Sequence, residues 1–444
     1  MPSNRRRSYK FAMSGVGAVQ PDFDTPMPDA SLNTAWNITS DTLPTVEEEL
    51  TRNLDCTQQD LTGVELQRRF ARWNFDFEPD PAMLAPAVAY LAGVAAAPVG
   101  SPRNQEFTLT IASATGGTFK LLLPVGARLK ETAPIPYNFD AATLKRALEN
   151  LTAIGRGQLT VTSLGGGAWK VAVGGNLARG SLGLITSDVS ALTGGGASVD
   201  VDETQTAIQR AHSIHRMTGD QPPPWSAIIG SENSTAALRK WVSLVLDSLR
   251  IGGGRNAPRL TASAGVAGSA EPHFAAAGFV LPACQIYRAA RFLDCDLIID
   301  GVSYQDANLW RSFELRAGNS LITDEDANTD RDEDIHRAER GDVRAFAIDA
   351  TVLGDDSDDL YQLAKFKSEV PVQLRVGRSG NNVTFDLPKG LVTLRSPDIV
   401  FDGSARRSAI ALTIEPELIP GDSSTPWTAT ANVNQSATLL TPTL

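Results

Sequence analysis

Apolar and polar residues alternate in many short stretches of this chain, and this period of two constrains the fold more than any other feature of the sequence. Residues 70–77 read Phe-Ala-Arg-Trp-Asn-Phe-Asp-Phe, and similar alternation recurs at 107–111, 370–376 and 409–414. Successive side chains of a strand point to opposite faces of a sheet, so this pattern predicts strands with one buried face. We therefore expect a mainly β fold with a minor helical part, built as sandwiches or barrels.

Three short segments break the period of two and predict helices. The first, 82–91, is apolar and rich in alanine, and the last is 360–366. The middle one follows Asp140, a good N-cap residue, and has leucines at i, i+4 and i+7, namely Leu144, Leu148 and Leu151. None of the three is long enough to suggest a helical bundle.

The segment 104–203 differs from the rest of the chain in composition. It holds 15 of the 37 glycines and carries eight basic and eight acidic residues, so it is neutral. Its alternating stretches predict one hairpin that turns at Gly116 and Gly117 and a second that turns at 165–167. We expect a compact inserted β domain with one helix.

Outside this insert, two parts of the chain follow the same order of an acidic segment, a strand and a helix. The first comprises Glu47, Glu48 and Glu49, then 70–77 and 82–91, and the second comprises 324–334, 343–352 and 360–366. A repeated order of elements indicates a duplicated domain. The expected division is therefore one discontinuous domain from 1–103 and 204–278, the insert at 104–203, and a second copy at 279–444.

Charge and cysteine content restrict the functional classes. The net charge is −11, and because the insert is neutral, the other 344 residues carry all of it. An acidic surface disfavours sequence-independent binding to DNA, yet it suits a channel through which DNA must slide. Three cysteines without a CxxC pair suit a reducing compartment, and no stretch is apolar enough for a membrane helix. The basic start of the chain is expected to be a mobile arm.

Signatures of chemistry are absent from the sequence. It has no GxSxG, no Walker loop and no HExxH. His212 and His215 are close enough to share a helical face, but nothing fixes a metal geometry around them. The run from Asp324 imitates a calcium loop, yet Thr329 replaces the required glycine and Ile335 the closing glutamate. We expect no enzyme, no catalytic residue, no cofactor and no metal.

The two strand-turn-helix segments at 70–91 and 343–366, with the run 237–251, resemble the tail tube, or major tail, proteins of long-tailed bacteriophages. Within the insert, 115–119, 133–138 and 141–151 resemble an Ig-like decoration domain. The resemblance implies a structural virion protein, assembled in the host cytoplasm, that polymerises into stacked rings around a DNA channel in the tail.

The same resemblance implies partners. These are further copies of the chain, expected in homotrimeric, pseudo-hexameric rings with hexameric rings as the alternative, and other tail proteins such as the tape measure and the terminator. DNA would pass in transit without specific binding, and no membrane would be involved. The acidic segments are the candidate contacts between rings or subunits: Glu47, Glu48, Glu49, Asp324, Asp326, Asp330, Asp332 and Asp334.

Two other classes of protein stay open. A bacterial surface or adhesion protein is the first alternative, because domains like the insert occur there too. A carbohydrate-active enzyme that uses paired carboxylates in 355–359 is the second, although such clusters more often cap a helix.

Overall fold

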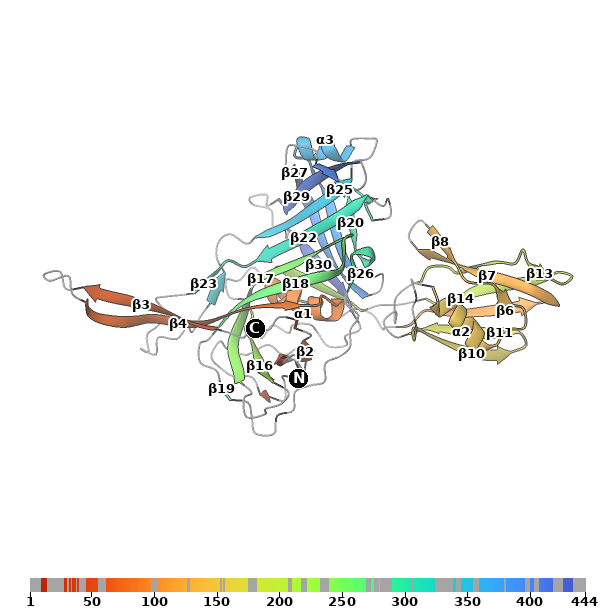
Figure 1. The fold of residues 1–444 in the computed structure, drawn as a ribbon, viewed down its shortest axis with the longest axis horizontal. Helices are drawn as coiled ribbons and strands as arrows, with labels where there is room; N and C mark the ends of the chain where they lie inside the picture. Colours follow the sequence, from red (N-terminus) through yellow and green to blue (C-terminus); the bar gives the residue numbers. More distant parts are fainter. Residues whose placement is uncertain are drawn as a thin grey trace, which may run out of the picture.

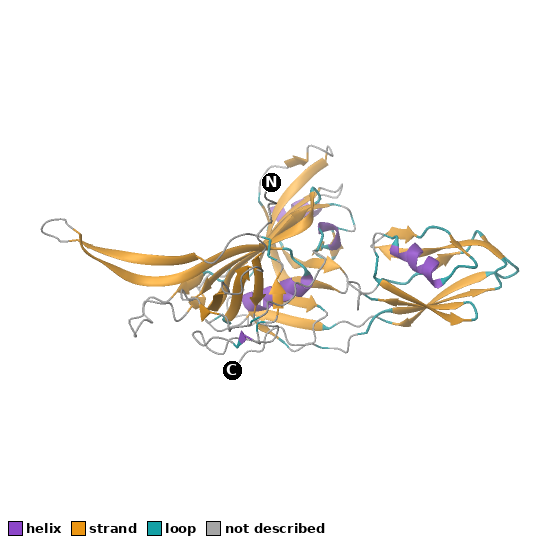
Figure 2. Cartoon of the chain, turned by 60° about the horizontal axis from the view of Figure 1, so that its bottom comes forward, coloured by secondary structure: helices purple, strands orange, loops and turns teal. Residues whose placement is uncertain are grey.

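The fold is that of a computed structural model and is mainly β, as the alternation predicts, with antiparallel sheets and few helices (Figure 1, Figure 2). The structure describes residues 9–13, 28–29, 32, 34–36, 38–39, 45–54, 61–96, 99, 103–125, 128–151, 154, 156–174, 182–206, 210–216, 222–231, 239–268, 273–274, 279, 290–305, 307, 309–323, 338–340, 345–353, 359–378, 381–395, 400–402, 407–417 and 426–433.

Most strands outside the insert belong to one 19-stranded network, and these strands supply most residues of the main hydrophobic core. Its strands are β1 (Tyr9–Met13), β2 (Thr34–Trp36), β3 (Thr45–Leu54), β4 (Leu61–Phe77), β5 (Gly93–Ala95), β15 (Ala211–Arg216), β16 (Trp225–Ser231), β17 (Arg239–Gly254), β18 (Ala257–Gly268), β19 (His273–Phe274), β20 (Asp296–Ile299), β21 (Val302–Ser303), β22 (Trp310–Gly318), β25 (Phe346–Leu353), β26 (Glu369–Arg378), β27 (Asn381–Leu394), β28 (Val400–Asp402), β29 (Arg407–Pro416) and β30 (Thr428–Asn432).

Eight of these strands lie edge to edge in the order β3, β4, β18, β17, β22, β25, β29, β27, and every pairing between them is antiparallel. Two hairpins extend from this row. One is β3 with β4, which projects to the left in Figure 1, and the other continues β22 and β25 through β23 (Leu321–Thr323) and β24 (Ala338–Arg340). We call this row of eight strands the long sheet.

A helix that is buried on nearly all sides covers one face of the long sheet. Helix α1 (Pro81–Ala92) contacts β17, β27 and the strands β15 and β30 of a second layer. Its many alanines allow this close approach from several directions, because they add little volume. It begins at Asp80, whose side chain accepts a hydrogen bond from the amide of Ala82, and ends at Gly93 in a left-handed conformation.

Alternation places the aromatic residues of β4 in the core. Trp73, Phe75 and Phe77 are each at most 2% exposed, and their rings pack in sequence at tilted angles, with centroids 4.2 and 6.0 Å apart. The residues between them, Arg72, Asn74 and Asp76, are exposed on the other face. The sequence pattern therefore predicted correctly which face of this strand is buried.

The insert has two sheets and a core that shares no residue with the main cluster. Its elements are β6 (Glu106–Ala112), β7 (Gly116–Val125), β8 (Arg128–Glu131), β9 (Ile135–Pro136), α2 (Ala141–Glu149), β10 (Leu159–Gly165), β11 (Ala168–Val173), β12 (Thr186–Asp188), β13 (Leu192–Thr193) and β14 (Ser198–Gln205). It lies to the right in Figure 1, and its first and last strands pair with each other, so its two ends are adjacent.

One predicted hairpin of the insert is confirmed and the other is wrong. β10 and β11 pair around the glycine turn as expected, and Asp140 caps α2 by accepting a hydrogen bond from the Thr143 amide. However, β6 pairs with β11 and β14, whereas β7 pairs with β8, β9, β12 and β13. Phe107 of β6 and Phe119 of β7 both belong to the insert's core, so the two strands lie in different sheets around that core and the connection crosses between them.

Helix α3 (Asp359–Lys365) corresponds to the last predicted helix, and a short 3-10 turn spans Phe292–Asp294. Among the described residues, no helix is long and apolar enough to cross a membrane.

Candidate assembly surface

The long sheet is built by two units with the same strand pairing, and each unit also contains one further strand and one helix. Unit 1 is β3, β4, α1, β16, β17 and β18, and unit 2 is β22, β25, α3, β26, β27 and β29, in the same chain order. When only the strands of each unit are counted, the first strand pairs with the second and the second pairs with the fifth. The fifth strand pairs in turn with the fourth, and the fourth with the third. Four matching pairings in one order are difficult to explain by chance.

An irregularity in the ladder recurs at the same place in both units. In unit 1 the register moves from Trp225 opposite Leu244 to Ala227 opposite Trp241. In unit 2 it moves from Val370 opposite Gly390 to Val372 opposite Leu387. Both steps advance two residues on one strand and three on the other, which is a β-bulge of one extra residue. Bulges are local and specific, so their coincidence aligns the units residue by residue.

The buried positions give the same alignment. In unit 1 the core residue Phe77 pairs with Ala262, and in unit 2 the core residue Val352 pairs with Ile410. The shared bulge makes Leu244 of β17 correspond to Gly390 of β27. Between Leu246 and Ser248, β17 has one extra residue that β27 lacks, so Leu249 corresponds to Leu394.

The two units join edge to edge through their main chains. Strand β22, the first of unit 2, pairs on one side with β25 and on the other with β17 of unit 1, where Leu249 lies opposite Ala317 and Arg250 opposite Arg316. Gly252 and Gly254 at the end of β17 allow the close approach, since a Cβ at Gly254 would lie 3.1 Å from the Arg311 carbonyl oxygen. The junction extends one continuous sheet across both units.

The long sheet has an unpaired edge at each end within the described part of the chain. At one end, β3 pairs with β4 alone. At the other end, β27 pairs with β26 only as far as Leu391, so Thr393, Leu394 and Arg395 have β29 on one side and no strand on the other. Unpaired edges are templates for pairing with another chain.

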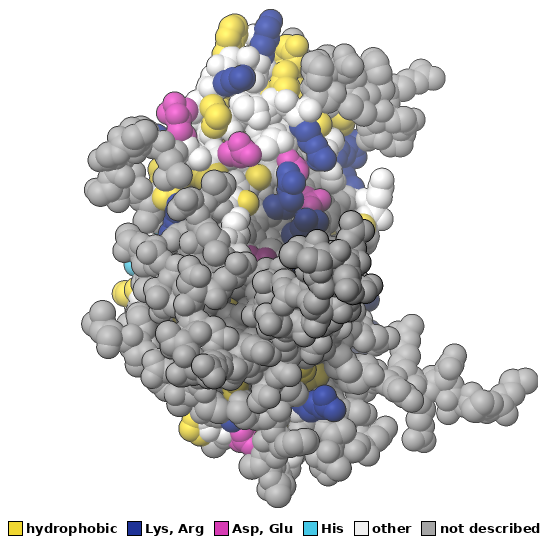
Figure 3. All heavy atoms as spheres, turned by 90° about the vertical axis from the view of Figure 1, so that its left-hand side faces the viewer, with side chains coloured by type: hydrophobic (Ala, Val, Ile, Leu, Met, Phe, Trp, Pro, Cys, Tyr) yellow, Lys and Arg dark blue, Asp and Glu magenta, His cyan; other side chains and the backbone are white. Residues whose placement is uncertain are grey.

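The face of the long sheet opposite α1 is polar and carries both positive and negative side chains. Figure 3 shows basic and acidic side chains next to each other on the upper part of the molecule. Its described charged side chains include that of Asp349, which is buried, and the following exposed ones: Arg72, Asp76, Arg250, Arg259, Glu314, Arg316, Lys389, Arg395 and Glu415. We call this surface the open face.

Asp349 connects the strands of unit 2 on the open face. Its carboxylate accepts a hydrogen bond from the Thr413 hydroxyl at 2.7 Å and forms ion pairs with Arg316 at 2.5 Å and Arg395 at 3.7 Å. Only 7% of its side chain is exposed. The contacts satisfy the buried carboxylate and explain why a charged residue is tolerated there.

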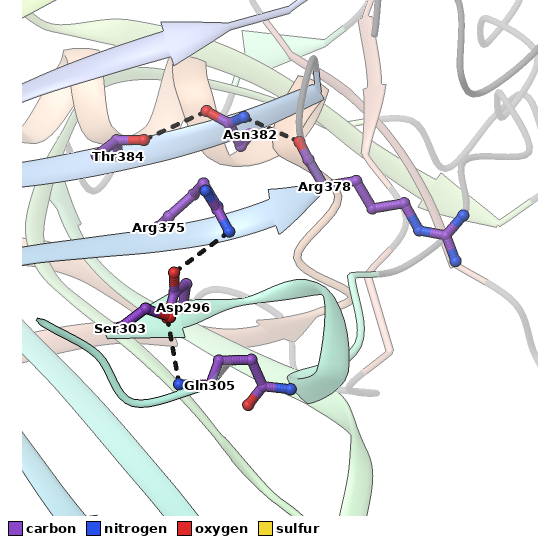
Figure 4. A network of polar contacts seen from close by, with 7 residues as sticks. All are labelled: Asp296, Ser303, Gln305, Arg375, Arg378, Asn382 and Thr384. Atoms are coloured by element: carbon purple, nitrogen blue, oxygen red, sulfur yellow. Dashed lines mark hydrogen bonds and ion pairs between the residues drawn. The ribbon is translucent and has the colours of Figure 1, made fainter. Parts of the chain in front are cut away.

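A second polar network lies between β20, β21 and β26 (Figure 4). The carboxylate of Asp296 accepts hydrogen bonds from the Ser303 hydroxyl at 2.8 Å and the Gln305 amide at 3.3 Å, and its other oxygen is 3.4 Å from Arg375. Both oxygens are thus engaged within the protein. The network stabilises the strand contacts and presents no free carboxylate for catalysis.

Asn382 is the centre of a separate group of polar contacts at the start of β27. Its amide group donates to the Arg378 carbonyl at 2.9 Å, and its oxygen accepts from Thr384 at 3.3 Å and from Asn432 at 3.1 Å. These contacts hold β27 to β30 rather than offering a ligand site (Figure 4).

The residues considered for chemistry are dispersed in the structure. His212 and His215 lie in strand β15, not on a helix, so their side chains point to opposite faces. No group of three or more metal-binding side chains occurs in the part of the chain that the structure describes. Burial raises the pKa of the Cys295 thiol to about 12, so this sulfur stays protonated and is a poor nucleophile.

Of the two acidic segments expected at subunit contacts, the structure describes the first and not the second. Glu47, Glu48 and Glu49 belong to strand β3 rather than to a loop. Asp324, Asp326, Asp330, Asp332 and Asp334 lie outside the described residues. The edge residues Thr393, Leu394 and Arg395 were missed, because nothing in a strand's own sequence says which of its edges has no partner.

Comparison with models of known protein families gives no match, and comparison with curated proteins gives none either. The arrangement of the chain is therefore the basis on which its function can be argued.

Proposed function

We propose that the chain is a tail tube subunit of a long-tailed bacteriophage, a structural protein that polymerises into stacked rings around a channel for DNA. The observation that carries the proposal is the junction between the units. One unit adds its first strand to the exposed edge of the previous unit, and the last unit again presents an edge. Repeating that contact between chains extends the sheet, and a constant rotation closes it into a ring.

The number of units favours three chains in a ring. Each unit contributes four strands to the long sheet, so three chains with two units each give a barrel of about 24 strands, and with strands about 4.8 Å apart and tilted by about 40° its backbone diameter is about 48 Å. Six chains would double the diameter to about 96 Å. The smaller barrel leaves room for one DNA duplex, so homotrimeric rings with pseudo-six-fold symmetry are proposed over hexameric rings.

The open face is the surface proposed to line the channel. Side chains between its charged residues are small or hydroxylated, such as Ser248, Ser263, Thr351 and Thr393. The net charge of the sequence predicts an acidic lining, and the described charged side chains of this face are of both signs. Its arginines are paired or interspersed with carboxylates, which limits the release of counterions that drives phosphate binding.

The remaining parts of the proposal follow from the assembled tube. Copies in successive rings stack head to tail, with the projecting hairpin of β3 and β4 placed to reach a neighbour. The insert faces outward as a decoration, other tail proteins such as the tape measure and terminator meet the tube, and the location is the virion tail after assembly in the host cytoplasm.

Electron microscopy tests the proposal directly. The purified full-length protein, concentrated and viewed in negative stain, is expected to form rings or tubes, and helical reconstruction is expected to show three chains in each ring. Protein that stays monomeric at every concentration and ionic strength tested would refute the proposal. Rings of six chains would reject the trimer alone.

A further inference from the structure

We propose that the ring closes by antiparallel pairing of β27 in one copy with β3 in the next, in a defined register. Thr393, Leu394 and Arg395 of one copy lie opposite Glu47, Val46 and Thr45 of its neighbour. The inference rests on the proposed function, because it names the edges through which ring neighbours meet. It comes from the junction of β17 and β22, which is the same contact formed inside one chain.

The alignment of the units defines the register. Leu249 corresponds to Leu394, as the bulges and buried positions establish. On the other strand, Ala317 pairs with Phe346, and Val46 pairs with Ala71 at the equivalent position of β4, so Ala317 corresponds to Val46. Since Leu249 faces Ala317 within the chain, Leu394 faces Val46 between chains.

Hydrogen-bond directions on β27 agree with this register. The Arg395 amide donates to the Ala411 carbonyl on the β29 side, and the Val392 amide donates to Ser368 on the opposite side. Alternate residues of an antiparallel strand direct their main-chain groups to alternate edges. The N–H and C=O of Leu394 therefore point to the unpaired edge.

The same reasoning applies to the strand that meets this edge. The Gly318 amide donates to the Ala345 carbonyl on the β25 side, so the main-chain groups of Ala317 point toward β17. By the alignment, those of Val46 point away from β4. Two residues whose main-chain groups face each other form the hydrogen-bonded pair of an antiparallel ladder, and pairing satisfies groups that are otherwise exposed.

The flanking pairs then become sites for a crosslink between copies. Thr393 with Glu47 and Arg395 with Thr45 occupy non-hydrogen-bonded positions, where opposed Cα atoms are about 4.5 Å apart, within the range that a disulfide spans. The diagonal pair Arg395 with Glu47 is about 7–8 Å apart, which is too far.

The experiment compares double cysteine variants of the full-length chain, assembled and then treated with a mild oxidant. T393C/E47C and R395C/T45C are each expected to convert at least half of the chains into covalent multimers that end at three chains on a non-reducing gel and collapse on reduction. The single variants and the diagonal variant R395C/E47C are expected to stay below a tenth. R250C/R316C, at the junction inside the chain, is the positive control and is expected to crosslink within one chain.

The outcomes separate the two proposals. If rings or tubes form and R250C/R316C crosslinks, while both predicted pairs stay uncrosslinked, the edge pairing is wrong and the tube proposal stands. If the diagonal pair crosslinks better than the direct pairs, the register is wrong. If the unsubstituted protein forms neither rings nor tubes, the proposed function itself fails.

Discussion

Burial and helix capping have opposite effects on the pKa of Asp80 at the start of α1. Its side chain caps the helix by accepting a hydrogen bond from the Ala82 amide at 2.8 Å, while the residue is only 4% exposed. Burial raises its pKa from 3.8 to about 6, and the hydrogen bond from Ala82 offsets part of that rise. The folded protein therefore holds a proton at Asp80 at a pH where the unfolded chain has released it.

This shift predicts how Asp80→Asn changes with pH. At pH 3 and below the carboxyl is protonated in both states, so its contribution is fully present, and it is lost as pH rises through about 4 to 6. Asparagine caps a helix equally well and does not titrate. The stability of the variant relative to the parent is expected to rise by about 3 kcal/mol between pH 3 and pH 7.

Urea unfolding of both proteins across this pH range checks the expectation. Their difference isolates Asp80 from the other carboxyl groups, which titrate equally in both proteins. A difference that does not vary with pH would mean that the pKa of Asp80 is ordinary.

At the scale of elements, α1 meets β26 at a point where only glycine fits. Gly377 has φ of +111°, and a Cβ on it would lie 2.5 Å from the Asn381 carbonyl oxygen and 2.8 Å from the ring of Pro81. The residue links the end of β26 to the first turn of α1, so the helix sits against the sheet without a gap. Both the backbone conformation and the contact exclude a side chain.

Gly377→Ala is expected to destabilise the protein by about 1–3 kcal/mol from backbone strain, with a further cost from the contact. Gly301→Ala is the matched control, because Gly301 also has positive φ, at +79°, but nothing lies within 4 Å of its added Cβ. Chemical denaturation is expected to rank Gly377→Ala clearly below Gly301→Ala. Equal stabilities would show that α1 and β26 can separate without cost.

At the scale of the whole molecule, the insert is attached at two adjacent points. Glu106 of its first strand pairs with Gln205 of its last, and the Gln205 side chain donates to the Asn104 carbonyl at 2.7 Å. Its core and the main core have no residue in common. Adjacent ends permit removal with little strain on the remaining chain.

A short Gly-Ser linker in place of residues 104–203 is therefore expected to leave folding and assembly intact. The shortened chain should unfold cooperatively and form tubes of the same inner dimensions in electron micrographs, with less density outside. A folded, shortened chain that no longer assembles would show that the insert takes part in the tube.

The sequence by itself determined the local structure of this protein. Alternation at 70–77 predicted both the strand and its buried face, and Asp140 predicted the start of α2. These succeed because the period of a strand and the capping of a helix depend on neighbouring residues. The repeated order of strand and helix also suggested duplication before the pairings were known.

Only the tertiary structure decided which strands pair. The expected hairpin of β6 and β7 is two strands in different sheets, and the acidic segment at Glu47 is part of an edge strand. The common bulge and the unpaired edge at Leu394 have no signature in the sequence. The physical reason is that main-chain hydrogen bonds are the same for every partner strand, so alternation specifies the face of a strand and leaves its edge to the rest of the fold.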